Sequence, residues 1–169
     1  QANAGIIFWG MGISQHTHGT DNSRCLISLA LLTGNIGKEG SGLHPLRGQN
    51  NVQGASDAGL IPMFLPDYQS VSDPQVRSKY EAVWQFPLPK EQGLTVVEIT
   101  NAAFNGNIKA MYIMGENPAM SDPDQNHVRA ALAKLDCLVV QDIFPTETAA
   151  FADIILPASA FPEKTGTVT

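Results

Sequence analysis

The sequence predicts an α/β fold with mostly parallel sheets, covered by helices on both faces. Short apolar runs alternate along the chain with segments of helical periodicity, which is typical of strands joined by right-handed helical crossovers. The apolar runs are continuous, as expected for strands that are buried on both faces. A polar stretch between residues 36 and 89, rich in Gly, Pro, Asn, Gln and Ser, separates two regions with this pattern.

The first region predicts a strand, a Gly-rich turn and a helix. The glycine-bounded run of residues 5–10 is expected to be a buried strand. A helix is expected from Asp21 to Thr33, with Asp21 or Asn22 as its cap and Gly34 at its end. The polar stretch that follows predicts a functional loop or a crossing between domains, because structureless segments of this length are rare within one compact domain.

The second region predicts a longer series of elements. After a short helix at 73–84, a helix capped by Thr95 is expected from Thr95 to Phe104. The elements expected after it are a strand at 109–114, a helix at 125–135, a strand at 137–142, one or two helical turns at 146–151 and a strand at 152–156.

Composition excludes two classes of protein. The 169 residues carry a formal charge of −6 and only 15% are charged, with no basic stripe, so no nucleic acid partner is expected. The apolar runs are too short to cross a bilayer, so no membrane insertion is expected. Cys25 and Cys137 lack metal-binding spacing and are predicted to be buried thiols, which is consistent with a cytoplasmic protein.

Polar and small residues follow the predicted strands. Ligands of open parallel sheets bind beyond the carboxyl ends of the strands, and this composition suits a nucleotide. Ordinary Gly- and Asn-rich turns are the alternative.

Asp142 is suited to a guanine edge or a ribose, or is a loop carboxylate. Glu163 and Lys164 form a surface pair, or Lys164 offers its ammonium to a phosphate. His16 and His18 are expected to line a ligand pocket. A metal site is the alternative.

Arg47 is the only cation between Ser41 and Ser56. The planar guanidinium, with five donors, is suited to a carboxylate ligand. The alternative is a solvated loop arginine. The sequence alone leaves both interpretations open.

A series of short motifs resembles the molybdopterin oxidoreductase family over essentially the whole chain and in the same order. The motifs are Trp9-Gly10-Met11-Gly12, Gln15-His16, Leu32-Thr33-Gly34-Asn35-Ile36-Gly37, Arg47-Gly48-Gln49-Asn50-Asn51-Val52-Gln53-Gly54, Gly115-Glu116-Asn117-Pro118, Gln141-Asp142, Ala152-Asp153-Ile154-Ile155-Leu156-Pro157 and Glu163-Lys164-Thr165-Gly166-Thr167. Within this family, the Arg47–Gly54 motif most resembles the catalytic alpha subunits of formate dehydrogenases. The resemblance implies that this chain is an internal fragment of such a subunit. Residues 55–59 are most similar to soluble, NAD-linked members.

The resemblance implies two Rossmann-like three-layer αβα domains, with residues 1–49 in the first and 50–169 in the second. It implies a bis-molybdopterin guanine dinucleotide with Mo or W. Met11 and Gln15 match motif positions that line one of the two dinucleotides in the family. The positions that would contact a guanosine and its phosphates are Asn117, Gln141, Asp142 and Lys164. Arg47 would orient formate, with Gln49 nearby in the pocket.

The same resemblance implies that the metal-ligating Cys or selenocysteine and the iron–sulfur cysteines lie upstream of these residues. The segment alone is therefore expected to be inactive. The partners it implies are formate or CO2 and electron-transfer domains or subunits, with an NAD-linked acceptor as one case. Two alternatives stay open: a nitrate or other oxyanion reductase of the same fold, and a non-catalytic scaffold like the relatives in respiratory NADH dehydrogenases.

Overall fold

The computed structural model describes residues 3–169 and divides the chain into two compact units. The first unit comprises the residues up to Ala58 together with 168 and 169, and the second comprises Gly59–Thr167. Each unit contains its own parallel sheet, which confirms the predicted α/β class. The domain division implied by the resemblance, residues 1–49 and 50–169, stays a prediction.

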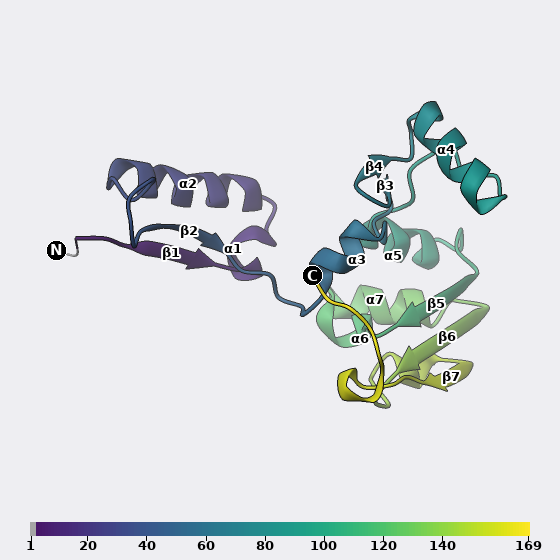
Figure 1. The fold of residues 1–169 in the computed structure, drawn as a ribbon. Coiled ribbons are helices and arrows are strands. Elements are labelled where there is room, and N and C mark those ends of the chain that lie inside the picture. Colours follow the sequence, from purple (N-terminus) through teal and green to yellow (C-terminus); the bar gives the residue numbers. More distant parts are fainter. Residues whose placement is uncertain (1–2) are drawn as a thin grey trace. The chain divides into compact units, whose positions relative to one another are not determined.

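The first unit is a βαβ arrangement (Figure 1). Strand β1 pairs in parallel with β2, in a register that sets Ile6 opposite Gly42 and Trp9 opposite Pro45. The elements of this unit are β1 (Ile6–Trp9), α1 (Met11–Ser14), α2 (Gly19–Leu32), β2 (Gly42–Pro45) and α3 (Val52–Asp57).

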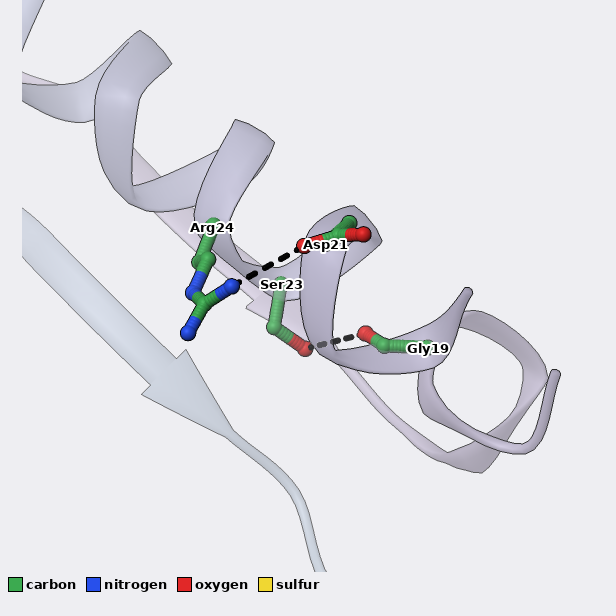
Figure 2. A network of polar contacts seen from close by, with 4 residues as sticks. All are labelled: Gly19, Asp21, Ser23 and Arg24. Carbon is green, nitrogen blue, oxygen red and sulfur yellow. Dashed lines mark hydrogen bonds and ion pairs between the residues drawn. The ribbon is translucent and has the colours of Figure 1, made fainter. Parts of the chain in front are cut away.

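The predicted helix of the first unit begins two residues earlier than expected. His18 precedes its first residue, Gly19, and no side chain caps the helix. The predicted cap Asp21 lies instead in the first helical turn and accepts a hydrogen bond from Arg24 at 3.0 Å (Figure 2). The other predicted cap, Asn22, donates to the carbonyl of Ile13. Both side chains were therefore wrongly predicted as caps, because the helix continues through them toward its N-terminus.

The apolar side chains of the first unit are poorly covered by other elements. The predicted buried strand β1 exposes half or more of Ile6 and Phe8, and Cys25, predicted to be buried, is exposed on α2. Both predictions of burial are wrong for this chain. The physical reason is that the described residues of this unit form a two-stranded sheet and one long helix, too few layers to cover an apolar strand on both faces.

The second unit contains a three-stranded parallel sheet in the order β5-β6-β7 and a small antiparallel pair, β3 with β4. Its elements are β3 (Phe64–Leu65), β4 (Gln69–Ser70), α4 (Pro74–Trp84), α5 (Val96–Phe104), β5 (Ala110–Met114), α6 (Pro118–Ser121), α7 (Gln125–Leu132), β6 (Cys137–Asp142), the short 3-10 helix η1 (Ala149–Phe151), β7 (Ile154–Pro157) and the 3-10 helix η2 (Phe161–Glu163).

The core of the second unit lies between the sheet and α7. Alternate residues of β6, Leu138 and Val140, are almost completely buried. They pack with Val128 and Leu132 from the apolar face of α7. Burying such side chains stabilises a fold by about 1.5–3 kcal/mol each. This packing fixes the direction of the three strands and therefore the place where their carboxyl ends meet.

Local sequence explains where two helices of the second unit begin. The Asp73 carboxylate accepts a hydrogen bond from the N–H of Gln75 at 2.8 Å, with Pro74 as the first residue of α4. At the start of α5, the Glu98 carboxylate accepts from the N–H of Thr95 at 2.8 Å and from its hydroxyl at 2.7 Å. The predicted role of Thr95 at this helix start is confirmed.

Within residues 3–169, no helix is both long enough and apolar enough to span a bilayer.

Candidate functional site

The carboxyl ends of the three parallel strands of the second unit surround a pocket of about 470 Å³. Its lining combines small residues with one amide, one carboxylate and one ammonium group. The lining residues are Met114, Gly115, Gln141, Asp142, Ile143, Ala158, Ser159, Ala160, Phe161 and Lys164. The structure thus brings together three of the four residues predicted to bind a dinucleotide in this half of the chain.

Strand β6 positions Gln141 and Asp142 at the rim of this pocket, as its last two residues. The carbonyl of Gln141 accepts from the N–H of Gly115 at 2.9 Å, and its side-chain oxygen accepts from the Tyr112 hydroxyl. One Asp142 oxygen accepts from the N–H of Ile143 at 2.6 Å. This single bond leaves further lone pairs of the Asp142 carboxylate for a ligand.

Lys164 completes the pocket from the residue after η2. The neighbouring carboxylate, Glu163, accepts a hydrogen bond from the N–H of Ala160 at 2.7 Å. No ion pair joins Glu163 to Lys164 within residues 3–169, so the predicted surface pair is not formed. Lys164 thus lines a pocket that also contains the carboxylate of Asp142, an arrangement suited to a phosphate and the polar edge of a base.

Asn117 does not line this pocket, although it was predicted to contact the same ligand. It lies just beyond β5, at the start of α6, and its side chain is bound to the segment that follows β6. Its amide nitrogen donates to Glu147 at 2.7 Å, and its amide oxygen accepts from the N–H and the hydroxyl of Thr148 at 3.1 and 2.8 Å. Asn117 therefore joins two loops at the carboxyl edge of the sheet.

Two carboxyl groups near this edge have shifted pKa values. The hydrogen bond from Asn117 lowers the pKa of Glu147, with smaller contributions from the Glu147 N–H and the charge of Arg129. Burial raises the pKa of Asp122, and the charge of Glu116 adds to that rise. Asp122 lines a second hollow of about 440 Å³, mostly apolar, between α5, β5 and α7, which contains none of the predicted site residues.

In the first unit, the predicted catalytic residues Arg47 and Gln49 flank Gly48 in an exposed loop. The Arg47 guanidinium donates to the side-chain oxygen of Gln53 at 3.2 Å, and the Gln53 amide donates to Asp57 at 3.0 Å. Residues of the same motif and helix α3 thus hold the guanidinium.

The loop after β1 lies against the Arg47 loop. The backbone of Leu46 donates to the carbonyl of Trp9 at 2.7 Å, which continues the strand pairing past Pro45. A β-carbon added to Gly48 would overlap the terminal methyl of Met11 and lie 3.6 Å from its sulfur. Gln15 donates to that sulfur at 3.3 Å. The structure therefore brings Met11 and Gln15 beside the predicted catalytic loop.

The two histidines after β1 do not form a metal site. The His16 ring nitrogen lies 2.8 Å from the carbonyl oxygen of Gly12 and so closes the turn of α1. In the described part of the chain, no three His, Cys, Asp or Glu residues lie close enough together to hold a metal ion.

Sequence reasoning missed several residues that shape the site. Tyr112 holds the pocket residue Gln141. Glu147 and Thr148 hold Asn117 at the same edge of the sheet. Thr146–Phe151 was predicted only as helical turns, and nothing in its local pattern indicates a partner 31 residues away. The one available signal was its position, directly after a polar strand end at the ligand-binding edge.

Comparison with known proteins gives a single family. The family description "Molybdopterin oxidoreductase" matches residues 1–169. The chain is 53% identical over 169 residues to "Probable oxidoreductase YjgC" of Bacillus subtilis, and 52% identical over 168 residues to "F420-dependent formate dehydrogenase subunit alpha" of Methanocaldococcus jannaschii. It is 45% identical over 170 aligned positions to "Formate dehydrogenase H" of Escherichia coli.

These alignments cover 99% to 100% of the chain but only 17% to 24% of each relative, so the chain spans about a quarter or less of the length of these proteins. The match to the family extends over both units and includes every residue of the two sites described above. The chain belongs to the molybdopterin oxidoreductase family.

Proposed function

We propose that this chain is part of a formate dehydrogenase that oxidises formate to CO2 at a Mo or W bis-molybdopterin guanine dinucleotide centre. One observation carries the proposal. Gln141, Asp142 and Lys164 converge on one pocket at the carboxyl edge of a parallel sheet, in a chain about half identical to named formate dehydrogenase subunits.

The chemistry of the pocket fits one guanine nucleotide portion of such a cofactor. Asp142 has acceptor oxygens for the paired N–H donors of a guanine edge, and Lys164 neutralises phosphate charge. Gly115, Ala158 and Ser159 let the backbone approach a ligand closely. When bound, the cofactor supplies the two-electron redox chemistry, and the protein supplies orientation and electrostatics.

The role of Arg47 is to orient the formate carboxylate. A guanidinium can donate two parallel hydrogen bonds to a carboxylate, and the bond to Gln53 restricts the guanidinium before substrate arrives. Gln49 follows in the same exposed loop and is proposed to line the substrate pocket. Met11 and Gln15, which lie beside this loop, are proposed to contact the other dinucleotide.

The remaining parts of the activity are proposed to lie in the rest of a longer protein. They are the metal-ligating Cys or selenocysteine, an iron–sulfur cluster and the electron-transfer domains or subunits, NAD-linked or not. The protein is proposed to act in the cytoplasm. The segment described here is proposed to be inactive by itself.

The test uses the full protein that carries this chain, purified with its cofactor. Metal analysis and acid release of GMP should give Mo or W together with about two GMP per metal. Formate should then reduce an artificial dye, whereas reduced dye should not be oxidised by nitrate. A protein with no metal and no GMP would be a scaffold. Nitrate turnover without formate turnover would make it an oxyanion reductase.

A further inference from the structure

The side-chain amide of Asn117 is held in one orientation. Its oxygen accepts both the N–H and the hydroxyl of Thr148, at 3.1 and 2.8 Å, and its nitrogen donates to a Glu147 oxygen at 2.7 Å. Because a backbone N–H can only donate and a carboxylate can only accept, a flipped amide would oppose two of these contacts. The three bonds therefore use both lone pairs of the oxygen and one amide hydrogen.

Thr148 is well suited to hold Asn117 because it is itself fixed. It is completely buried, and its hydroxyl oxygen accepts from the N–H of Ala119 at 3.1 Å while the hydroxyl hydrogen goes to Asn117. Arg129 donates to the Ala119 carbonyl at 3.0 Å and so adds a bond from α7. A buried hydroxyl with both partners in place resists rearrangement, since a lost partner leaves a desolvated polar group.

Glu147 holds the other end of the amide from an exposed position. The hydrogen bond from Asn117 is the largest cause of its lowered pKa, so the carboxylate is ionised at neutral pH and the bond is charge-assisted. Because Glu147 is exposed, replacing it alters the contact to Asn117 with little effect on packing. Substitutions of Glu147 therefore test this contact more specifically than substitutions of the buried Thr148.

We propose that Glu147 and Thr148 are positioning residues that orient the Asn117 amide, so that its one remaining N–H is directed to the guanosine portion of the cofactor. The inference rests on the proposed function, in which Asn117 contacts that portion. Asn117 lies outside the pocket lining described above, two residues beyond Gly115, which lines it. A fixed amide at this place binds a ligand without the entropic cost of ordering a free side chain.

The experiment measures GMP released per folded protein in the full-length protein purified with its cofactor. Thr148→Val removes the hydroxyl with little change of shape, and Glu147→Ala removes the carboxylate. Thr148→Ser and Glu147→Gln keep a hydroxyl and an acceptor and are the matched controls. Each change is made with Asn117 intact and with Asn117→Ala. GMP retained after dilution and gel filtration gives a readout that is independent of turnover.

With Asn117 intact, Thr148→Val and Glu147→Ala should each increase cofactor loss about three- to tenfold, as for one hydrogen bond. Thr148→Ser should stay within about twofold of the unaltered protein, and Glu147→Gln, which keeps only a neutral acceptor, should lie between the unaltered protein and Glu147→Ala. In the Asn117→Ala background neither change should increase the loss further, because both act through the missing amide.

Three results would overturn the inference. The first is equal loss in both backgrounds, which would make the two residues structural supports only. The second is normal GMP retention in Thr148→Val and Glu147→Ala when Asn117→Ala loses GMP. The third is normal retention in Asn117→Ala itself. Absence of GMP from the unaltered protein is a different outcome, which would refute the proposed cofactor. If Thr148→Val fails to fold, the exposed Glu147 variants decide the question.

Discussion

Gly19 packs so closely on Ser14 that a β-carbon at Gly19 would lie 2.6 Å from the Ser14 carbonyl carbon and overlap its oxygen. The obstruction is backbone, which cannot move aside as a flexible side chain can. This close approach lies where the chain turns from α1, which begins at Met11, into α2. The close approach explains why glycine begins a 14-residue helix here.

Gly19→Ala should therefore destabilise the first unit by about 3 kcal/mol, a typical cost of overpacking. Amide hydrogen exchange across α2 should accelerate in this variant. Gly12→Ala is the matched control, because a β-carbon at Gly12 would meet nothing within 4 Å. If both variants exchange like the unaltered protein, the Ser14 contact does not constrain the turn.

Arg47→Ala should lower kcat/KM for formate roughly 100-fold in the full protein, with GMP and metal content unchanged, a loss comparable to that of one oriented donor in an active site. Arg47→Lys should recover only part of this loss, because an ammonium lacks the planar pair of donors. Steady-state kinetics with formate provide the measurement.

Arg24→Ala is the control for the loss of an arginine. Arg24 pairs with Asp21 on α2 (Figure 2). Both side chains are about two-thirds or more exposed. Such pairs contribute little, so formate kinetics should stay within about twofold of the unaltered values. Normal kinetics in Arg47→Ala, with full cofactor content, would remove Arg47 from the substrate site.

Asp142→Asn should increase cofactor loss roughly tenfold or more, since it replaces a charged acceptor of two hydrogen bonds with a neutral amide. GMP retention after gel filtration is the measurement. Asp136→Asn makes the same change in an exposed residue 4.0 Å from Lys109 and should retain GMP normally. Equal retention in both variants would show that the Asp142 carboxylate does not contact the nucleotide.

The start of α5 should weaken in acid. The hydroxyl and the N–H of Thr95 lower the pKa of Glu98 below its ordinary value of 4.5. A carboxyl group with a lowered folded pKa stabilises the fold above its unfolded pKa and loses this contribution as the pH falls through the folded pKa. Relative to Glu98→Gln, the hydrogen-exchange protection of the first α5 turn should be constant above about pH 5 and should decrease toward pH 3.

A difference between Glu98 and Glu98→Gln that is the same at pH 7 and pH 3 would contradict this assignment. The comparison removes the effects of other carboxyl groups, because both proteins share them. Protection of α7, which lacks Glu98 and serves as the internal reference, should show the same pH dependence in both.

Elements with strong periodicity were predicted well from the sequence. Strand β6 has its predicted bounds of Cys137 to Asp142, and α5 begins after its predicted cap. Short elements were missed within the polar stretch. Strand β2 is four residues long and ends in Pro45, and its pairing with β1 depends on a contact about 36 positions away. Helix α3 contains Gly54 and Ser56, weak helix formers.

The site was predictable where it follows from topology and not where it follows from side-chain contacts. The rule that ligands bind at the carboxyl ends of parallel strands predicts Gln141 and Asp142 at the pocket. Lys164, which follows η2, was predicted from the family resemblance. No such rule predicts that Asn117 turns to Thr148, because this depends on the exact path of two loops. Exposure of Cys25 was also unpredictable, because an apolar pattern does not reveal how many layers cover it.

Strand β7 has a practical consequence for handling this part of the protein. It is one of the two outer strands of the three-stranded sheet in the described residues, and Ile154, Ile155 and Leu156 are each more than a third exposed. An apolar strand with an open backbone edge is a template for another strand. As an isolated segment, residues 1–169 should self-associate by strand addition, and a charged residue in place of Ile155 should keep the segment monomeric.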